Sequence, residues 1–210
     1  MTKTRPLPVP DPRRPLSDAQ RLAWLRLIRS EDVGPVTFRE LVNHFGGAEE
    51  ALDALPDLAR RGGRGRTIRV CPLGVAEAEL EKATRAGAGL VALDEAGYPP
   101  LLAVTDAPPP LLYVKGRRAL VDRPAVAIVG ARDASAAGRK LARTLAQALA
   151  EAGFVVASGL ARGIDAAAHE AALEAGTIAV VAGGIDVVYP PEHAELQRRI
   201  GEQGLLVAES

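Results

Sequence analysis

Two short apolar runs, each leading to a glycine, constrain the fold of this chain more than any other feature. Ala125–Val129 leads directly into Gly130. Phe154–Ala157 leads through Ser158 into Gly159, and a helical pattern follows each of the two glycines. Apolar runs of this length that alternate with helices are typical of buried parallel strands in an α/β sheet. Ligands of such sheets bind at the carboxyl ends of the strands, where loops meet helix N-termini.

The same alternation continues along the sequence and predicts a right-handed parallel sheet. Glycine and proline residues separate the periodic segments, as is typical of βαβ units. The expected strands are Val126–Val129, Phe154–Ala157, Thr177–Val181 and Leu205–Ala208, and the expected helices are Ala136–Ala152, Ala166–Ala175 and Pro190–Gln203.

The region before this sheet predicts a smaller unit made of short helices. Ser17 suits the N-cap of a first helix, and Thr37 suits the N-cap of a second over Phe38–Phe45. A third helix is expected over Glu49–Leu55, because Pro56 follows it. The turn between the first two helices, DVGPVT, is either a phosphate-binding hairpin of the helix-hairpin-helix type or a turn that only packs the helices together.

Composition divides the chain into four segments. Residues 1–16 are proline-rich and are expected to form a disordered tail, followed by a small helical domain over residues 17–60. Residues 61–73 belong to an arginine- and glycine-rich stretch and are expected to be a basic linker, with a phosphate-contacting arm as the alternative. Residues 74–210 form the sheet domain. Within it, Tyr98–Gly116 is so rich in proline that it predicts an extended connection and no central strand or helix.

Charge and cysteine content narrow the classes of function. The 26 Lys and Arg residues balance 26 Asp and Glu residues, so any nucleic-acid site must be local and cannot cover the whole surface. The single cysteine, Cys71, excludes an internal disulfide and a zinc site built from several cysteines. No apolar run reaches the length of about 18 residues that spans a membrane, and the N-terminus lacks the apolar core of a signal peptide. A cytoplasmic protein without membrane contact is therefore expected.

The loops that follow the two apolar runs contain the candidate binding residues. Glycines let an anion approach the backbone, and amide groups at helix starts supply hydrogen bonds and partial positive charge. Two arginines at adjacent strand ends suit a pair of phosphates. The residues alone leave two interpretations, phosphate binding or simple glycine turns beside solvated arginines. The candidates are Gly130 and Arg132 in the first loop, and Ser158, Gly159, Arg162 and Gly163 in the second.

The sequence offers no recognisable catalytic group. Asp165 and His169 lie one helical turn apart, which suits two metal ligands without a third, and a helix cap beside a semi-buried histidine is the interpretation we expect. Tyr189 is either a residue that stacks on a nucleic-acid base or a core tyrosine. No serine lies in a G-x-S-x-G pattern. We therefore expect no enzyme activity, no metal and no cofactor.

The sequence resembles the DprA/Smf family of DNA-processing proteins. The segments VAIVGAR, GFVVASGLARGIDAAAHEAAL, TIAVVAGGIDVVYPPEHAEL and GLLVAES carry the resemblance, in that order. Upstream, WLRLI…VGP…FGG and YPPLL…PPPLLYVKG are similar to the family's N-terminal region, so the likeness extends from about Ser17 to Ser210. The resemblance implies an α/β fold, a Rossmann-like parallel sheet with helices on both faces, preceded by a small all-α domain of the SAM or helix-hairpin-helix type.

The resemblance also implies a function and a site. The family's G-x-R loop falls on Gly130–Arg132, and its SGLA-basic-GID loop falls on Ser158–Asp165. Arg132 and Arg162 would then contact backbone phosphates, with the amides of Ser158 and Gly159 beside them. The implied protein is non-enzymatic, binds and protects incoming single-stranded DNA, and helps to load a RecA-type recombinase in natural transformation.

Two other functions remain open at this point. The first is a nucleotide-binding hydrolase on a related Rossmann-like fold, although AGGIDVVYPPE lacks the GT pair that such enzymes carry. The second is a protein-interaction scaffold. The family's sheet continues beyond the position of Ser210 toward a dimerisation surface, so the Rossmann-like domain is expected to be incomplete relative to the family, and a homodimer is left open.

Overall fold

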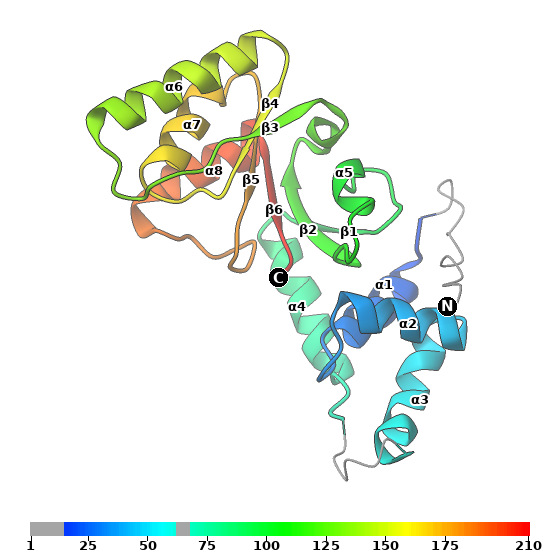
Figure 1. Cartoon of the computed structure of the whole chain (residues 1–210). Helices are drawn as coiled ribbons and strands as arrows, with labels where there is room; N and C mark the ends of the chain where they lie inside the picture. Colours follow the sequence, from blue (N-terminus) through cyan, green and yellow to red (C-terminus); the bar gives the residue numbers. More distant parts are fainter. Residues whose placement is uncertain (1–14, 62–67) are drawn as a thin grey trace. The chain divides into compact units, whose positions relative to one another are not determined.

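The structure is a computed structural model that describes residues 15–61 and 68–210 (Figure 1). Most of the predicted tail over residues 1–16 lies outside the described residues. Residues 62–67, the centre of the arginine-rich stretch, also lie outside the described residues, and with them the expected linker and the alternative phosphate-contacting arm. Within the described ranges, no helix has the length and the apolar character needed to cross a membrane.

The chain divides into two compact units. One unit contains the described residues up to Lys82 together with Leu90–Leu111, and the other contains Ala83–Gly89 together with Leu112–Ser210. The sequence placed residues 90–111 with the sheet, whereas here they group with the N-terminal helices.

The first unit is built from short helices around an aliphatic and aromatic core. Ser17 caps α1 in a capping box, because its side chain accepts a hydrogen bond from the Gln20 amide while the Gln20 side chain accepts one from the Ser17 amide. The rings of Trp24 and Phe38 meet edge to face with centroids 5.0 Å apart. The helices are α1 (Asp18–Ile28), α2 (Pro35–Phe45), α3 (Ala48–Arg61) and the start of α4 (Leu73–Arg85).

The third helix is longer than the sequence predicted. Pro56 was expected to end it, yet α3 continues through this proline to Arg61. A proline inside a helix removes one backbone hydrogen bond. Ala51, Leu52 and Leu55, which precede the proline, are buried and hold this part of α3 in the core.

A half-buried ion pair fixes the turn after β1 (Gly89–Ala92) within the first unit. The Arg21 guanidinium donates to both carboxylate oxygens of Glu95, each at 2.7 Å, and to the Leu90 carbonyl at 2.9 Å. Glu95 in turn accepts the Ala92 amide at 2.9 Å. A short helix, α5 (Pro100–Ala103), follows this turn.

The second unit is organised by a mixed sheet. Its strands lie in the order β2-β6-β5-β4-β3, in which β3 to β6 are parallel and β2 is antiparallel to β6. The sequence missed β2, because Pro108, Pro109 and Pro110 suggested an irregular connection. These prolines end where the strand begins, and Leu111 to Val114 are buried. The strands are β2 (Leu111–Gly116), β3 (Ala125–Ala127), β4 (Val155–Ser158), β5 (Thr177–Val180) and β6 (Leu205–Ala208).

The helices that connect the parallel strands lie on one face of the sheet. Ala146 and Ala168, from the first two of these helices, share a buried cluster with Val156 of β4. Gly201, from the third, packs on Leu206 of β6, and the strand register places Val156 and Leu206 on the same face. The helices therefore cover one face and not both, because right-handed crossovers between strands in sequential order put every helix on the same side. They are α6 (Ala136–Glu151), α7 (Ile164–Ala172) and α8 (Ala194–Gln203), and two 3-10 turns, η1 (Arg118–Asp122) and η2 (Pro191–His193), complete the unit (Figure 1).

Candidate functional site

Three loops meet at the carboxyl edge of the parallel strands. The loops follow β3, β4 and β5, which are neighbours in the sheet, and they cover residues 128–135, 159–163 and 181–190. All candidate residues except Ser158, which is the last residue of β4, lie in the first two loops. The structure therefore brings the two predicted segments together at one edge.

Hydrogen bonds from β4 and α7 fix the path of the first loop. The Ser158 hydroxyl donates to the Ile128 carbonyl at 2.6 Å, and the Ile128 amide donates to the Ala157 carbonyl at 3.0 Å. The Ile164 amide donates to the Ala131 carbonyl at 3.3 Å. Ser158 is buried, so its side chain has a structural role in this arrangement.

Two of the predicted glycines permit this close approach. A Cβ atom on Gly130 would lie 2.7 Å from Cγ1 of Ile164. Gly163 has a φ of +77°, and a Cβ atom there would lie 2.3 Å from the Ala131 carbonyl oxygen and 2.6 Å from that of Arg132. The backbones of the two loops thus interlock. Gly163, which follows Arg162, lies against the backbone carbonyl of Arg132.

The amides of the second loop are occupied from within the protein. The buried Asp165 carboxylate accepts the Gly159 amide at 3.2 Å and the Ala161 amide at 3.3 Å. The sequence predicted that the Gly159 amide binds a phosphate, but in the structure this amide donates its hydrogen bond to Asp165. Gly159 accordingly shapes the loop, and its amide and that of Ala161 are not available to an anion.

Arg132 and Arg162 are both exposed but differ in their partners. Arg132 has no hydrogen bond or ion pair to any residue in the described ranges. The Arg162 side chain is 60% exposed and pairs with Glu192 of η2. Their hydrogen bond raises the pKa of Arg162 and lowers the pKa of Glu192, so both groups are charged at neutral pH.

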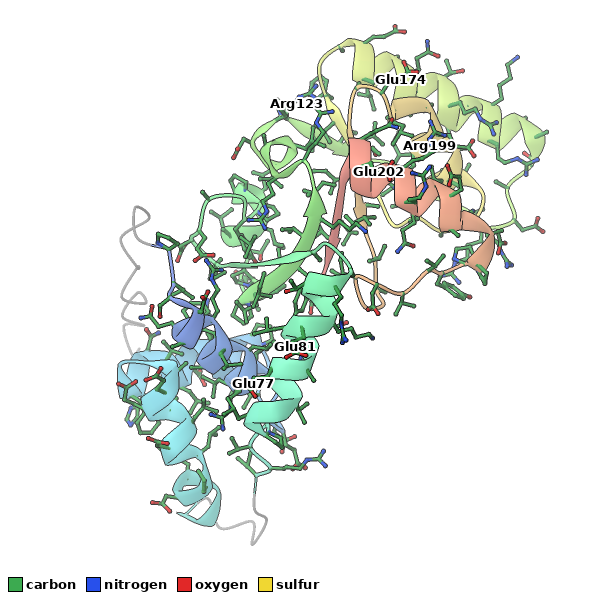
Figure 2. All side chains as sticks on the ribbon, turned by 180° about the vertical axis from the view of Figure 1, so that it is seen from behind. Glu77, Glu81, Arg123, Glu174, Arg199 and Glu202 are labelled. Carbon is green, nitrogen blue, oxygen red and sulfur yellow. The ribbon has the colours of Figure 1, made fainter. Side chains whose placement is uncertain are left out.

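A third arginine shows the contrast with a structural guanidinium. Arg123, labelled in Figure 2, donates to the Gly153 carbonyl and to the Ala175 carbonyl, both at 3.0 Å. These carbonyls follow the C-terminal ends of α6 and α7, where a cation is favourable. Arg132 makes no such contact with the described residues, so its charge remains available to a ligand.

Asp165 and His169 have structural roles, but not in the form that the sequence predicted: the N-cap of α7 is Gly163, Asp165 lies inside the helix and binds the preceding loop, and His169 is fully buried. The Thr177 hydroxyl donates to the Val156 carbonyl at 2.6 Å, so Nδ1 of His169 is the donor in the 2.8 Å contact with Thr177 Oγ1. Burial lowers the pKa of His169 to about 4, and the ring is neutral at physiological pH. Among the described residues no group of three potential metal ligands gathers here.

This buried histidine should make stability depend on pH. The folded pKa of about 4 lies below the ordinary value of 6.5, so between these values the unfolded chain binds a proton that the folded chain does not. The free energy of unfolding should therefore fall as the pH drops from 6.5 to 4, by up to about 3 kcal/mol. Urea unfolding of the wild type and of His169→Gln at several pH values would measure this contribution.

The control for this measurement is His44→Gln, because His44 is exposed. The stability advantage of the wild type over His169→Gln should shrink on acidification, whereas the difference between the wild type and His44→Gln should not follow this trend. Equal pH dependence in the wild type and His169→Gln would contradict the assignment of a neutral buried ring.

The sequence missed the contribution of η2. Glu192 neutralises Arg162, and His193 donates from Nδ1 to the Leu160 carbonyl at 2.9 Å, which ties the third loop to the second. The only indication in the sequence was that Glu192 follows β5, and β5 is the neighbour of β4, the strand that precedes Arg162. Tyr189 is 70% exposed, so its interpretation as a core tyrosine is wrong.

Comparison with known families identifies both parts of the chain. The model of the DNA recombination-mediator protein A family matches residues 89–210, and the model of a DprA-like N-terminal HHH domain matches residues 18–82.

Individual relatives agree with these matches. Protein Smf of Synechocystis sp. is 34% identical over 206 residues, which cover 92% of this chain and 52% of the relative. A putative DNA processing protein DprA of Mycobacterium tuberculosis is 41% identical over 175 residues, which cover 81% of this chain and 42% of the relative. The chain spans about half the length of these curated relatives.

Solved structures share the fold. The X-ray structure of DNA processing protein A from Streptococcus pneumoniae matches with a TM-score of 0.68 at 28% identity, covering 94% of this chain and 69% of that one. DNA processing protein A from Helicobacter pylori, described for its unique single-stranded DNA binding mode, matches with a TM-score of 0.53 at 33% identity, covering 59% of this chain and 55% of that one.

Proposed function

Because the chain belongs to the DNA recombination-mediator protein A family, whose members are the DprA and Smf proteins, we propose that it binds single-stranded DNA at the loops after β3 and β4. The observation that carries this proposal is the pair of exposed arginines on two interlocked loops. The guanidinium of arginine suits phosphate oxygens in charge and in geometry. In this proposal Arg132 and Arg162 contact successive phosphates, and the chain reads no base sequence.

The glycines of the site act through the backbone. Gly130 and Gly163 allow the two loops to approach each other, and Gly159 accommodates the Asp165 carboxylate. Ser158 holds the first loop through the Ile128 carbonyl. These four residues position the arginines, which leaves the direct phosphate contacts to the two guanidinium groups.

Glu192 must give way when a phosphate reaches Arg162. The two side chains are 60% and 49% exposed, and an ion pair at this degree of exposure contributes little to stability. A phosphate can therefore replace the carboxylate at small cost. The pair keeps Arg162 oriented at the strand edge in the absence of DNA.

The wider role follows from the family. We propose that the chain protects single-stranded DNA and helps to load a RecA-type recombinase, as a homodimer and without catalysing a reaction. Two observations support a non-enzymatic role. The Ser158 hydroxyl is engaged by the Ile128 carbonyl, and His169 is buried and bound to Thr177, so neither is placed to act on a substrate.

Binding to fluorescent oligonucleotides at several salt concentrations tests the proposed function. Single strands should bind more tightly than duplexes, and the logarithm of the association constant should fall with the logarithm of salt by about 0.7 for each neutralised phosphate. Absence of binding, or equal affinity for both forms, would contradict the proposal. Hydrolysis of a mononucleotide by the purified chain would favour the nucleotide hydrolase instead.

A further inference from the structure

Tyr189 differs from every other aromatic residue of the chain. It is 70% exposed, whereas the other six are buried or half-buried. A large aromatic side chain normally contributes to folding through burial, so one left exposed on an ordered loop is more informative than a scattered aliphatic residue. The other six are Trp24, Phe38, Phe45, Tyr98, Tyr113 and Phe154.

The backbone on both sides of Tyr189 is held in place. The Gln197 side chain donates from Nε2 to the Val187 carbonyl at 3.0 Å, and the Ile185 amide donates to the Ser210 carbonyl at 2.8 Å. On the other side Pro190 is buried. The ring therefore projects from a fixed segment, and little backbone order has to be gained when a ligand meets it.

The surroundings of Tyr189 combine a guanidinium group with apolar surface. Glu192, three residues after Tyr189 in the chain, forms an ion pair with the Arg162 guanidinium, so the segment that carries Tyr189 lies beside this cation. Val187 and Val188, just before it, are 45% and 40% exposed. A planar ring next to a phosphate-binding cation is the arrangement that single-stranded nucleic-acid sites use.

We propose that Tyr189 is a stacking platform for one unpaired base, adjacent to the phosphate held by Arg162. This inference rests on the proposed function and adds a source of selectivity to it. Arginine contacts with phosphates are available in single and double strands alike. A base can stack on Tyr189 only when it has left its duplex neighbours, so the tyrosine provides the preference for single strands.

Three substitutions at this position test the platform. Tyr189→Ala should weaken single-strand binding about 5- to 100-fold, the range typical for loss of one stacking aromatic, and should leave the dependence on salt unchanged. Tyr189→Phe should bind like the wild type, because the ring is retained. Leu145→Ala on α6 is the matched control, since Leu145 is also an exposed apolar residue at 50%, and it should bind normally.

The fluorescence of Tyr189→Trp gives a direct readout of stacking. Trp24 is buried, so the added signal comes from the new ring, and a single-stranded oligonucleotide should quench it. An oligonucleotide without bases should bind the wild type and Tyr189→Ala with the same affinity.

The outcomes separate the two proposals. Wild-type binding to single strands that Tyr189→Ala leaves unchanged would overturn the stacking role while the arginine site stands. No binding by the wild type at any salt concentration would overturn both. A change in the salt dependence of Tyr189→Ala would also overturn the stacking role, because it would assign the tyrosine to the phosphate contacts.

Discussion

Replacement of Arg132 and Arg162 together by alanine is expected to weaken single-stranded DNA binding by about two to four orders of magnitude. A hydrogen bond to a charged group typically contributes about 1.5–3 kcal/mol, and the double variant loses two such contacts. Loss of two phosphate contacts should also reduce the slope of the salt dependence by about 1.4, since each contact to a single strand contributes about 0.7. Fluorescence anisotropy at several salt concentrations measures both changes.

Two further variants make this result specific. Arg143→Ala removes an arginine that is also about half exposed and paired with a glutamate, Glu170, but lies in the middle of α6. It should bind like the wild type. Glu192→Gln removes the carboxylate that competes for Arg162 and should bind more tightly. If the double variant bound DNA as tightly as Arg143→Ala, the assignment of the site to Arg132 and Arg162 would be wrong.

Gly163→Ala is expected to destabilise the sheet unit by about 3 kcal/mol or more and to abolish DNA binding with it. The new methyl group would lie 2.3 Å and 2.6 Å from two backbone carbonyl oxygens, so the loop that carries Arg132 would have to move. The positive φ adds a conformational cost of its own. Urea unfolding followed by circular dichroism measures the loss.

Gly153→Ala is the matched control for this substitution. Gly153 has a φ of +89°, but no atom lies within 4 Å of the position of its Cβ. It should therefore cost only about 1–2 kcal/mol, the price of the left-handed conformation, and should leave DNA binding intact. Equal effects of the two substitutions would show that the contact between the loops is unimportant.

Local sequence patterns predicted the parallel part of the fold. The apolar runs that became β3 to β6 are short, nearly uninterrupted and bounded by glycine or proline, and their short length favours strands over helices. The strand β2 was not predicted because three prolines precede Leu111, and the sequence pattern does not show that a regular strand begins directly after Pro110. The placement of the helices on one face depends on the spatial order of strands, which no local pattern contains.

The meeting of the two candidate loops at one edge of the sheet was predicted from the sequence, whereas phosphate binding by these loops stays a prediction. Arg132 and Arg162 were found because each follows a predicted strand end. The occupied amide of Gly159 was missed, because the carboxylate that accepts it belongs to the next helix and was expected only to cap that helix. Glu192 was missed for a different reason: it lies 30 residues beyond Arg162, and such a pairing is set by tertiary structure alone.

The interlocked loops have a consequence for the speed and precision of recognition. Since Gly163 packs against the carbonyls of Ala131 and Arg132, neither loop can shift without the other. If Arg132 and Arg162 bind phosphates as proposed, their backbones are already positioned relative to each other, and mainly side-chain torsions have to be ordered on binding. In the proposed complex, the spacing between the two phosphate contacts is therefore set by the fold before DNA arrives.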